Sequence, residues 1–461
     1  MTNWSPDLST RAGPRYRAIA DALETDIAGG RLAAGERLPT HRLLAHTLGV
    51  TVGTITRAYA EAGRRRLVTA TVGRGTFVRD RRRPAAPTAT RGDPDLSDLR
   101  SNYPVHGLAD EVLAETLEQI RHDANLGELL QYQDHAGIPR HRAAGASWIA
   151  RSGVNVSPSR VLVTAGGQHA LAVAFMTLTR PGDVVLTEDL TYHNVRGLAA
   201  MLRVGLHGVA LDSEGLVPEA FEAACRSQAP RALYCTPSFQ NPTAAVMGRE
   251  RRRRIAEIAA AYGVAVIEDD VYGFLEPGAL PLAAHAPGPI CYVTSVSKSL
   301  APGLRVGYLA VPEGEVPRFT AAMRDTCWMA TPLAAEIATR WIDEGDGDRL
   351  AAELRREAIA RQEIARRALS GIDLPGHPSS FHLWLPLPRP WRAEEFTRRA
   401  RAAGVAVMPA DAFAVGPNPP QAVRLCLGAA RSRAELARAI ELLAGIVGEQ
   451  PALHEAHPSI I

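Results

Sequence analysis

The fold is decided by residues 294–305, Thr-Ser-Val-Ser-Lys-Ser-Leu-Ala-Pro-Gly-Leu-Arg. Lys298 is the only lysine in the chain, and arginine supplies all the rest of the 52 Lys and Arg residues. Arginine replaces lysine well on a solvated surface, but a guanidinium stays protonated and cannot attack a carbonyl group. Ser295, Ser297 and Arg305 suit a phosphate close to that amine. We therefore expect a phosphorylated carbonyl compound at Lys298; the alternative is a surface lysine that compositional drift has missed.

The composition is typical of a globular protein with more than one domain. At 461 residues, with 46% hydrophobic and 22% charged residues, two to three domains are expected. The opening MTNWSPDLST lacks the basic start and apolar run of a signal peptide, and no stretch reaches the roughly 18 apolar residues of a membrane span. Five scattered cysteines without a CxxC pair favour free thiols in the cytoplasm over a disulfide framework, a zinc site or another metal site.

The net charge of +3 hides a difference between the two ends of the chain. Residues 1–91 contain 16 arginines and 7 acidic residues, which gives +9 and leaves −6 for the remainder. A basic head on a mildly acidic body indicates a polyanionic partner for the head alone.

The head has the pattern of a helix-turn-helix. Residues 14–28 carry apolar side chains at helical spacing and end at two glycines. A second helix is expected over 41–48, ending at Gly49, and a third begins after the capping residue Thr51. The inward side of this third helix is expected to carry Val52, Ile55, Tyr59 and Ala62, and the opposite side Thr51, Thr54 and Arg57. Residues 67–78 then read as a hairpin, so the head predicts a recognition helix with a wing beside it.

Three short motifs in this order resemble the winged-helix domain of GntR-family regulators: LPTHR at 38–42, LGVT at 48–51 and GRGTFV at 73–78. The resemblance implies a DNA-binding domain over residues 14–80. It also implies base or phosphate contacts by Arg42, positions in the major groove for Thr51, Thr54 and Arg57, and a wing contact by Arg74. A solvated face would explain any one of these arginines alone. Residues 81–99 are rich in Pro, Ala and Arg and are interpreted as a linker.

The body, residues 100–461, predicts an α/β fold. Seven strand-like runs alternate with helical patterns, which favours a mostly parallel sheet covered by helices. These runs are 161–164, 184–187, 206–211, 232–236, 264–268, 290–295 and 306–311. A long helix over 349–368 leads to a small C-terminal α/β domain with strand-like runs at 381–385, 405–408 and 423–427. The run Arg251–Arg254 reads as the solvated start of a helix.

Candidate chemistry follows the carboxyl ends of these strands, where ligands collect in such sheets. Gly167 and Gln168 open a helix after the first run and suit a phosphate, although a packing turn is an equal alternative. Asn241 lies in a polar loop, where an isolated Asn is usually a turn residue. Asp269 and Tyr272, three residues apart, can be a helix cap and a core aromatic, or can hold a pyridine ring.

This order of motifs resembles fold-type I pyridoxal-phosphate aminotransferases over about 330 residues. The resemblance implies pyridoxal 5'-phosphate as cofactor, bound as an aldimine to Lys298, with Asp269 pairing the pyridine nitrogen. It further implies that Asn241 and Tyr272 approach the ring oxygen, that Tyr192 stacks on the ring, and that Arg424 grips a substrate carboxylate. The implied phosphate residues are Gly167, Gln168, Ser295, Ser297 and Arg305, with Tyr132 reaching the phosphate of a neighbouring subunit.

The chain departs from the family pattern at three positions. Gly167 stands where a hydroxyl is usual, Ala244 where a glycine follows Asn-Pro-Thr, and Leu190 where a proline precedes Tyr192 by two residues. These changes weaken individual contacts without removing a cofactor-binding group.

The two halves together resemble the MocR subfamily of transcription regulators. That architecture implies a homodimer that binds double-stranded DNA and senses an amine or amino acid through an external aldimine at Lys298. One alternative is a working aminotransferase that carries a DNA-binding head. Another is a DNA-binding protein whose body is only a dimerisation scaffold. Lys298 can serve both sensing and transamination, so these alternatives stay open at the level of sequence.

Overall fold

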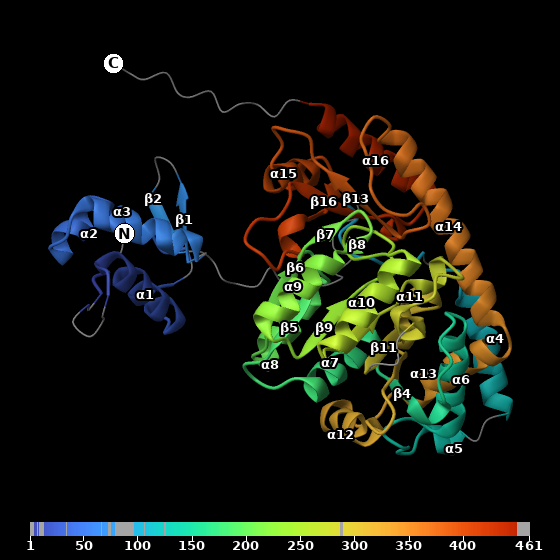
Figure 1. The fold of residues 1–461 in the computed structure, drawn as a ribbon. Coiled ribbons are helices and arrows are strands. Elements are labelled where there is room, and N and C mark those ends of the chain that lie inside the picture. The colour runs from blue at the N-terminus through green and yellow to red at the C-terminus, as the bar shows by residue number, and fades with distance from the viewer. Residues whose placement is uncertain are drawn as a thin grey trace. The chain divides into compact units, whose positions relative to one another are not determined.

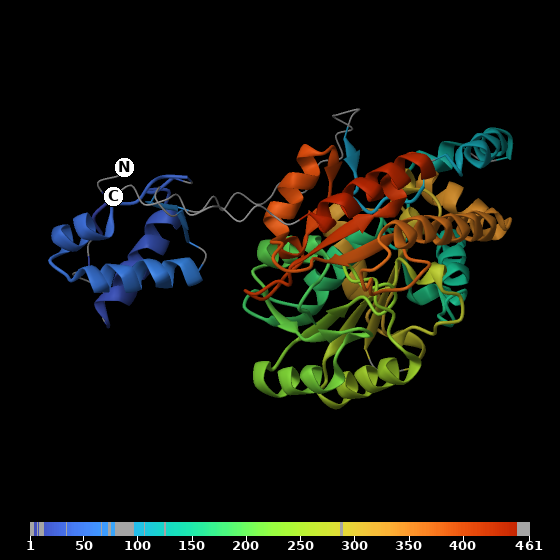
Figure 2. The same cartoon turned by 90° about the horizontal axis from the view of Figure 1, so that it is seen from above.

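A computed structural model describes residues 4–6, 8, 13–33, 35–65, 67–71, 75–78, 96–105, 107–123, 126–285 and 289–449. The chain forms two compact units, Met1–Thr90 and Arg91–Ile461 (Figures 1 and 2). Among the described residues, no helix combines the length and the apolar character needed to cross a bilayer.

The first unit has three helices and a two-stranded sheet, as predicted. These are α1 (Arg15–Ala28), α2 (His41–Leu48), α3 (Val52–Arg64), β1 (Val68–Thr71) and β2 (Gly75–Val78), with β1 and β2 antiparallel. Leu23, Leu44 and Ile55 pack in one apolar core. The prediction that Val52 faces inward is wrong, because its side chain is 45% exposed. Val52 is the first residue of α3, and the buried stripe begins one turn later at Ile55.

The second unit is built on a seven-stranded sheet, which confirms the predicted α/β class. The strand order is β4 (Val161–Thr164), β12 (Gly307–Ala310), β11 (Ile290–Ser295), β10 (Ala265–Asp269), β9 (Ala232–Cys235), β5 (Val184–Glu188) and β6 (Gly205–Val209). The neighbouring pairs from β11 to β6 are parallel. Only β12 runs against its neighbours, so β4 and β11 point the same way.

Helices cover both faces of this sheet because both faces are apolar (Figure 1). Alternate strand residues face opposite sides: Val185 and Ile267 pack with α7 (Gly167–Leu178), whereas Leu186 and Val266 pack with α10 (Arg249–Ala261). The remaining helices of this part are α4 (Asp110–Asp123), α5 (Leu126–Leu129), α6 (Pro139–Ala150), α8 (His193–Leu202), α9 (Pro218–Gln228), α11 (Val296–Ser299), α12 (Val316–Cys327) and α13 (Pro332–Asp343).

The C-terminal part adds a three-stranded sheet and a second apolar core. Its elements are the long helix α14 (Asp346–Ala368), β13 (His382–Pro386), α15 (Ala393–Ala402), β14 (Val405–Ala406), β15 (Met408–Pro409), β16 (Ala422–Cys426) and α16 (Arg433–Gly448). The expected single strand over 405–408 is divided, because β14 pairs with β3 (Ser97–Asp98) while β15 pairs with β16. The run 206–211 is divided as well, since β7 (Leu211–Asp212) pairs with β8 (Gly215–Leu216).

Candidate functional site

Polar side chains gather at one edge of the seven-stranded sheet. Strands β4, β9, β10 and β11 point the same way, so their carboxyl ends meet at that edge. Gly167, Asn241, Asp269 and Lys298 all follow or end one of these strands. The topology therefore brings together residues that are more than 130 positions apart in the chain.

A cradle for an anion forms where α7 begins. Gly166 adopts φ +84°, and a Cβ added to it would lie 2.6 Å from Arg305 Nη2. A Cβ on Gly167 would lie 3.4 Å from the Cβ of Ser295. The hydroxyls of Ser295 and Ser297 are 3.0 Å apart, and Arg305 donates to Ser297 Oγ over 3.3 Å. Free N–H groups at the helix start, two hydroxyls and a guanidinium together fit a phosphate group.

Lys298 lies on α11, directly after β11. Its Nζ donates to the main-chain carbonyl of Asn102. Burial lowers the pKa of Lys298 to about 8; Arg424 and Arg305 lower it further, while Cys426 and Asp269 act in the opposite direction. An amine with this pKa has an appreciable neutral fraction near pH 7, which is the form that attacks a carbonyl group.

Asp269 ends β10 and presents one free carboxylate oxygen. Its Oδ2 accepts a hydrogen bond of 2.9 Å from the hydroxyl of Tyr234. Its Oδ1 is buried and has no hydrogen-bond partner among the described residues. Burial raises the pKa of Asp269 to about 6, and the Tyr234 hydroxyl lowers it. The carboxylate is therefore mainly ionised at neutral pH and can accept an N–H from a ligand.

The Tyr272 hydroxyl accepts a hydrogen bond of 2.8 Å from Asn102 Nδ2, and burial raises the pKa of this tyrosine. The same amide nitrogen lies 3.0 Å from His382 Nδ1. Burial lowers the pKa of His382 to about 3, so the ring is neutral, and its Nε2 donates to the Gln240 carbonyl over 3.0 Å. His382 Nδ1 is then an acceptor, which identifies the Asn102 amide as donor to both neighbours. Tyr272 keeps its own proton for another acceptor.

Arg424, on β16, is fully buried and faces the same region. Its Nη1 donates to Asn241 Oδ1 over 2.7 Å, and its Nη2 donates to the Arg100 carbonyl over 2.6 Å. The guanidinium lies 4.6 Å from the ring centre of Phe413, and its Nε has no partner among the described residues. Asn241, expected near a ring oxygen, thus has its carbonyl oxygen held by Arg424.

Tyr192, at the start of α8, is joined to Gln168 through Asn194. Asn194 Nδ2 donates to the Tyr192 hydroxyl over 2.7 Å and lies 3.5 Å from Gln168 Oε1. Burial raises the pKa of Tyr192 to about 12. Next to it, His193 Nδ1 is buried without a partner in the described part of the chain, and burial lowers its pKa to about 4.

Tyr132 stands apart from this group. Its side chain is 83% exposed, and its ring contacts Trp328 with 5.9 Å between ring centres. A role at a neighbouring subunit therefore stays a prediction.

The sequence did not predict several neighbours of the site: Asn102, Asn194, Tyr234 and His382. Tyr234 is on β9, beside Asp269 on β10, so strand order and side-chain alternation would have identified it. Asn194 follows the expected ring residue Tyr192 by two positions. Asn102 lies in an irregular segment after the linker, and no local pattern marks it.

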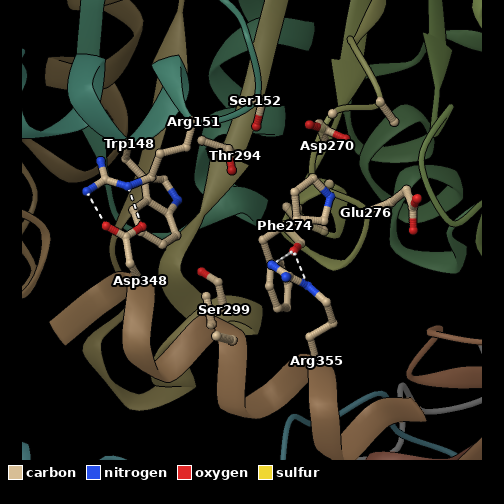
Figure 3. A pocket seen from close by; sticks show the side chains of 17 residues that line it. Trp148, Arg151, Ser152, Asp270, Phe274, Glu276, Thr294, Ser299, Asp348 and Arg355 are labelled. Atoms are coloured by element: carbon tan, nitrogen blue, oxygen red, sulfur yellow. Dashed lines mark hydrogen bonds and ion pairs between the residues drawn. The ribbon is translucent and has the colours of Figure 1, made fainter. Parts of the chain in front are cut away.

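A cavity of about 280 Å³ lies beside this group without containing its key residues (Figure 3). Thr294, Ser299 and Asp270 line it, but Lys298 and Arg424 do not. Its two arginines are engaged: Arg151 pairs with Asp348 and Arg355 donates to the Phe274 carbonyl, as the dashed lines show (Figure 3). The polar group around Lys298, and not this cavity, is the candidate active or sensing site.

The first unit presents a candidate DNA interface on α2 and α3. Arg42 and Arg57 are exposed and form no ion pair with any described residue. Thr51 caps α3: its Oγ1 accepts from the Thr54 N–H over 3.2 Å and lies 2.9 Å from Thr54 Oγ1. Both threonine hydroxyls are thus at the start of the expected recognition helix. Arg74 lies outside the described residues.

Two protein families match the chain, one for each unit. Residues 15–78 match the family of bacterial regulatory proteins called gntR, and residues 94–443 match aminotransferase class I and II. The second match covers most of the chain.

Two transcription regulators align with most of the chain, and a solved aminotransferase structure resembles the second unit. The uncharacterized HTH-type transcriptional regulator YdeF of Bacillus subtilis is 32% identical over 96% of this chain and 96% of its own. The HTH-type transcriptional regulator TauR of Rhodobacter capsulatus is 29% identical over 87% and 90%. The structure of LysN, the α-aminoadipate aminotransferase of Thermus thermophilus, complexed with N-(5'-phosphopyridoxyl)-L-leucine, superposes with a TM-score of 0.70 at 26% identity, covering 77% and 92%.

The folds of the two units, the two family matches and the named relatives all indicate the same class of protein. The chain belongs to the aminotransferase class I and II family, as one of the GntR-type regulators with an aminotransferase-like domain that form the MocR subfamily.

Proposed function

We propose that this chain is a pyridoxal 5'-phosphate-dependent transcription regulator that senses an amine or amino acid at Lys298. The observation that carries the proposal is a set of buried polar atoms without partners among the described residues. Each belongs to a residue whose main chain contacts Lys298 or whose side chain interacts with it electrostatically. They are Asn102 Oδ1, His193 Nδ1, Asp269 Oδ1 and Arg424 Nε. Buried polar atoms are rarely left unpaired, so this set fits a polar ligand.

The residues present fit the cofactor group by group. The cradle of Gly167, Ser295, Ser297 and Arg305 suits its phosphate, with Gln168 at the same helix start. The free oxygen of Asp269 suits a protonated ring nitrogen, and Tyr192 lies at the same edge of the sheet to cover the ring. Tyr272 has a proton to donate to a ring oxygen. When bound, pyridoxal phosphate supplies a carbonyl carbon that combines with amines and a ring that withdraws electrons from them.

Arg424 is the proposed anchor for a carboxylate on the effector. It is buried, its Nη groups form a fork, and its Nε–H is free among the described residues. A carboxylate would accept two parallel hydrogen bonds from this guanidinium, displacing the weaker neutral acceptors Asn241 Oδ1 and the Arg100 carbonyl. Amino acids and amino-acid-like amines are therefore the expected effector class.

The winged-helix unit, residues 14–80, is proposed to bind a double-stranded operator, with residues 100–461 as the sensing unit. Arg42, Arg57 and Arg74, with Thr51 and Thr54, are its proposed contacts.

We also propose a homodimer, because Leu130 and Tyr132 are 84% and 83% exposed and the Tyr132 ring contacts Trp328, which is itself 47% exposed. Such a patch is typical of an interface between subunits. A Leu130→Arg variant should lower the mass measured by light scattering; an unchanged mass would contradict this interface.

The central test is the absorption spectrum of purified protein mixed with pyridoxal phosphate. Wild type should develop a visible band that the Lys298→Arg variant lacks, because arginine keeps the positive charge but forms no covalent link. Individual amino acids are then added while operator affinity is followed by fluorescence anisotropy. A band that one amino acid shifts, together with a change in DNA affinity, supports the proposal. Absence of the band in the wild type would refute it.

A second candidate function is transamination. The lowered pKa of Lys298 suits transamination as well as sensing, because a neutral amine can also move protons during turnover. Release of a keto acid, measured with a coupled dehydrogenase, would assign this activity, whereas a shifted band without keto acid would leave sensing alone.

A further inference from the structure

The segment Leu99–Asn102, which we call the strap, contacts both of the basic side chains that a ligand would engage. Arg424 Nη2 donates to the Arg100 carbonyl over 2.6 Å, and Lys298 Nζ donates to the Asn102 carbonyl. The strap begins at Leu99, the last residue of the expected linker, and leads into the body. Two of its four carbonyl groups therefore hold the proposed cofactor amine and the proposed carboxylate anchor.

The strap is fixed at both ends by hydrogen bonds to other segments of the body. At its start, β3 pairs with β14, and the Leu99 N–H donates to the Ala406 carbonyl over 2.8 Å. Asp98 forms an ion pair of 2.6 Å with Arg100, which shapes the turn. At its end, the Asn102 amide donates to Tyr272 and to His382. These anchors keep the two carbonyls directed at Lys298 and Arg424.

We propose that the strap is an internal occupant of the ligand site that loading displaces, with Asn102 as its positioning residue. This inference rests on the proposed function, because the Lys298 amine would have to leave the Asn102 carbonyl in order to hold the cofactor. A carboxylate at Arg424 is a stronger acceptor than the Arg100 carbonyl and replaces it. The Asn102 carbonyl would then lose its donor, and the Arg100 carbonyl would keep only the Cys426 thiol at 3.5 Å. Because poorly paired buried carbonyls are unfavourable, each step favours movement of the strap. The movement begins next to the linker and thereby couples ligand binding to that end of the body.

Asn102 also positions the reactive groups themselves. Its amide supplies a proton to the Tyr272 oxygen, which leaves the tyrosine proton for a ligand, and its carbonyl orients the Lys298 amine. In Asn102→Asp, a carboxylate of the same shape would take the Tyr272 proton and favour the charged form of Lys298. The charged and titratable groups that act on Lys298 are Asp269, Arg305, Arg424 and Cys426, and two histidines, His193 and His382, interact with it electrostatically as well.

Hydrogen–deuterium exchange on the full chain tests the displacement. Peptides within residues 96–105 should exchange about fivefold faster or more in cofactor-free Lys298→Ala and Arg424→Ala than in wild type. Arg305→Ala, which removes a guanidinium from the same site without a strap contact, should leave them unchanged. Adding pyridoxal phosphate should accelerate them in wild type and not in Lys298→Ala. Unchanged exchange in both strap-contact variants, or after the cofactor has visibly bound, would overturn the inference.

The role of Asn102 is tested through the unique lysine. Reductive ¹³C-methylation gives one lysine signal in NMR spectra, and its pH midpoint should rise by about one unit or more in Asn102→Asp. The exposed Asn155→Asp is the matched control and should titrate as wild type. Equal midpoints in both variants would show that Asn102 has only a structural role. If the wild type binds no pyridoxal phosphate, the proposed function fails, while both experiments on cofactor-free protein still decide whether the strap contacts exist.

Discussion

Replacing Lys298 by methionine should stabilise the cofactor-free body, because the lysine charge is held in a poorly solvated place. Burial lowers its pKa from 10.5 to about 8, a difference that corresponds to about 3 kcal/mol at 1.36 kcal/mol per unit. The unfolded chain binds the proton more tightly than the folded one. The free-energy cost of burying the charged amine is thus fully present below about pH 8. It shrinks as the pH rises toward 10.5 and is absent above that pH. Lys298→Met also removes the hydrogen bond to the Asn102 carbonyl, which costs about 1–2 kcal/mol at either pH. It should therefore raise the free energy of unfolding by about 1–2 kcal/mol at pH 7, and the gain should be lost at pH 10.

Urea unfolding followed by tryptophan fluorescence measures this change, since five of the six tryptophans lie in the body. Lys298→Arg is the control, because arginine stays charged in the same surroundings and should give no gain. A methionine variant no more stable than wild type at pH 7, or a gain equally large at pH 10, would refute the reasoning that burial lowers the pKa of Lys298.

Three further predictions address other parts of the molecule. Arg424→Ala should weaken amino-acid binding at least tenfold in spectral titrations and keep the visible band; equal affinity would exclude it as the carboxylate anchor. Arg42→Ala should weaken operator binding in anisotropy titrations. It should also reduce the slope of log affinity against log salt concentration by about one, whereas Arg15→Ala on α1 should have little effect. Ala244 adopts φ +60°, so Ala244→Gly should raise the free energy of unfolding, measured by thermal denaturation, by about 0.5–1 kcal/mol. A lower free energy of unfolding would show that the left-handed backbone at Ala244 is not strained.

Periodicity and motif order predicted the framework of both units. The winged-helix elements follow caps and stops that act locally: Thr40 and Thr51 begin helices, and Gly49 ends one in the left-handed conformation. The predicted and observed bounds of the central strands agree within about one residue. The reason is that strands covered on both faces need continuous apolar runs, which are easy to recognise in a sequence. Lys298 and Asp269 could be located because they sit directly after such strands.

Contacts between distant segments could not be predicted in this way. Asn102 meets its partners from 170 to 280 positions away, and nothing in the surrounding sequence encodes that approach. Arg252, interpreted as part of a solvated run, is buried and donates to the Met247 and Pro237 carbonyls. Composition cannot distinguish it from its exposed neighbours, since only the tertiary fold supplies those carbonyls. Val52 was wrongly predicted to face inward. Its spacing fits the apolar stripe of α3, but the core of the first unit does not extend to the first turn of that helix.

The lowered pKa of Lys298 makes the amine chemically available without deciding between sensing and turnover. With a pKa of about 8, about a quarter of the molecules carry a neutral amine at about pH 7.5, compared with about one in a thousand for an ordinary lysine. That gain serves both roles equally, so the distinction must lie in the groups around the amine. Here the free amine is held by the Asn102 carbonyl, an acceptor on a segment that comes directly after the linker. When a lysine held by such a segment exchanges its partner, the main-chain carbonyl of that segment loses a hydrogen bond and the segment is free to move. A sensor needs such a coupling, whereas catalysis alone does not require it.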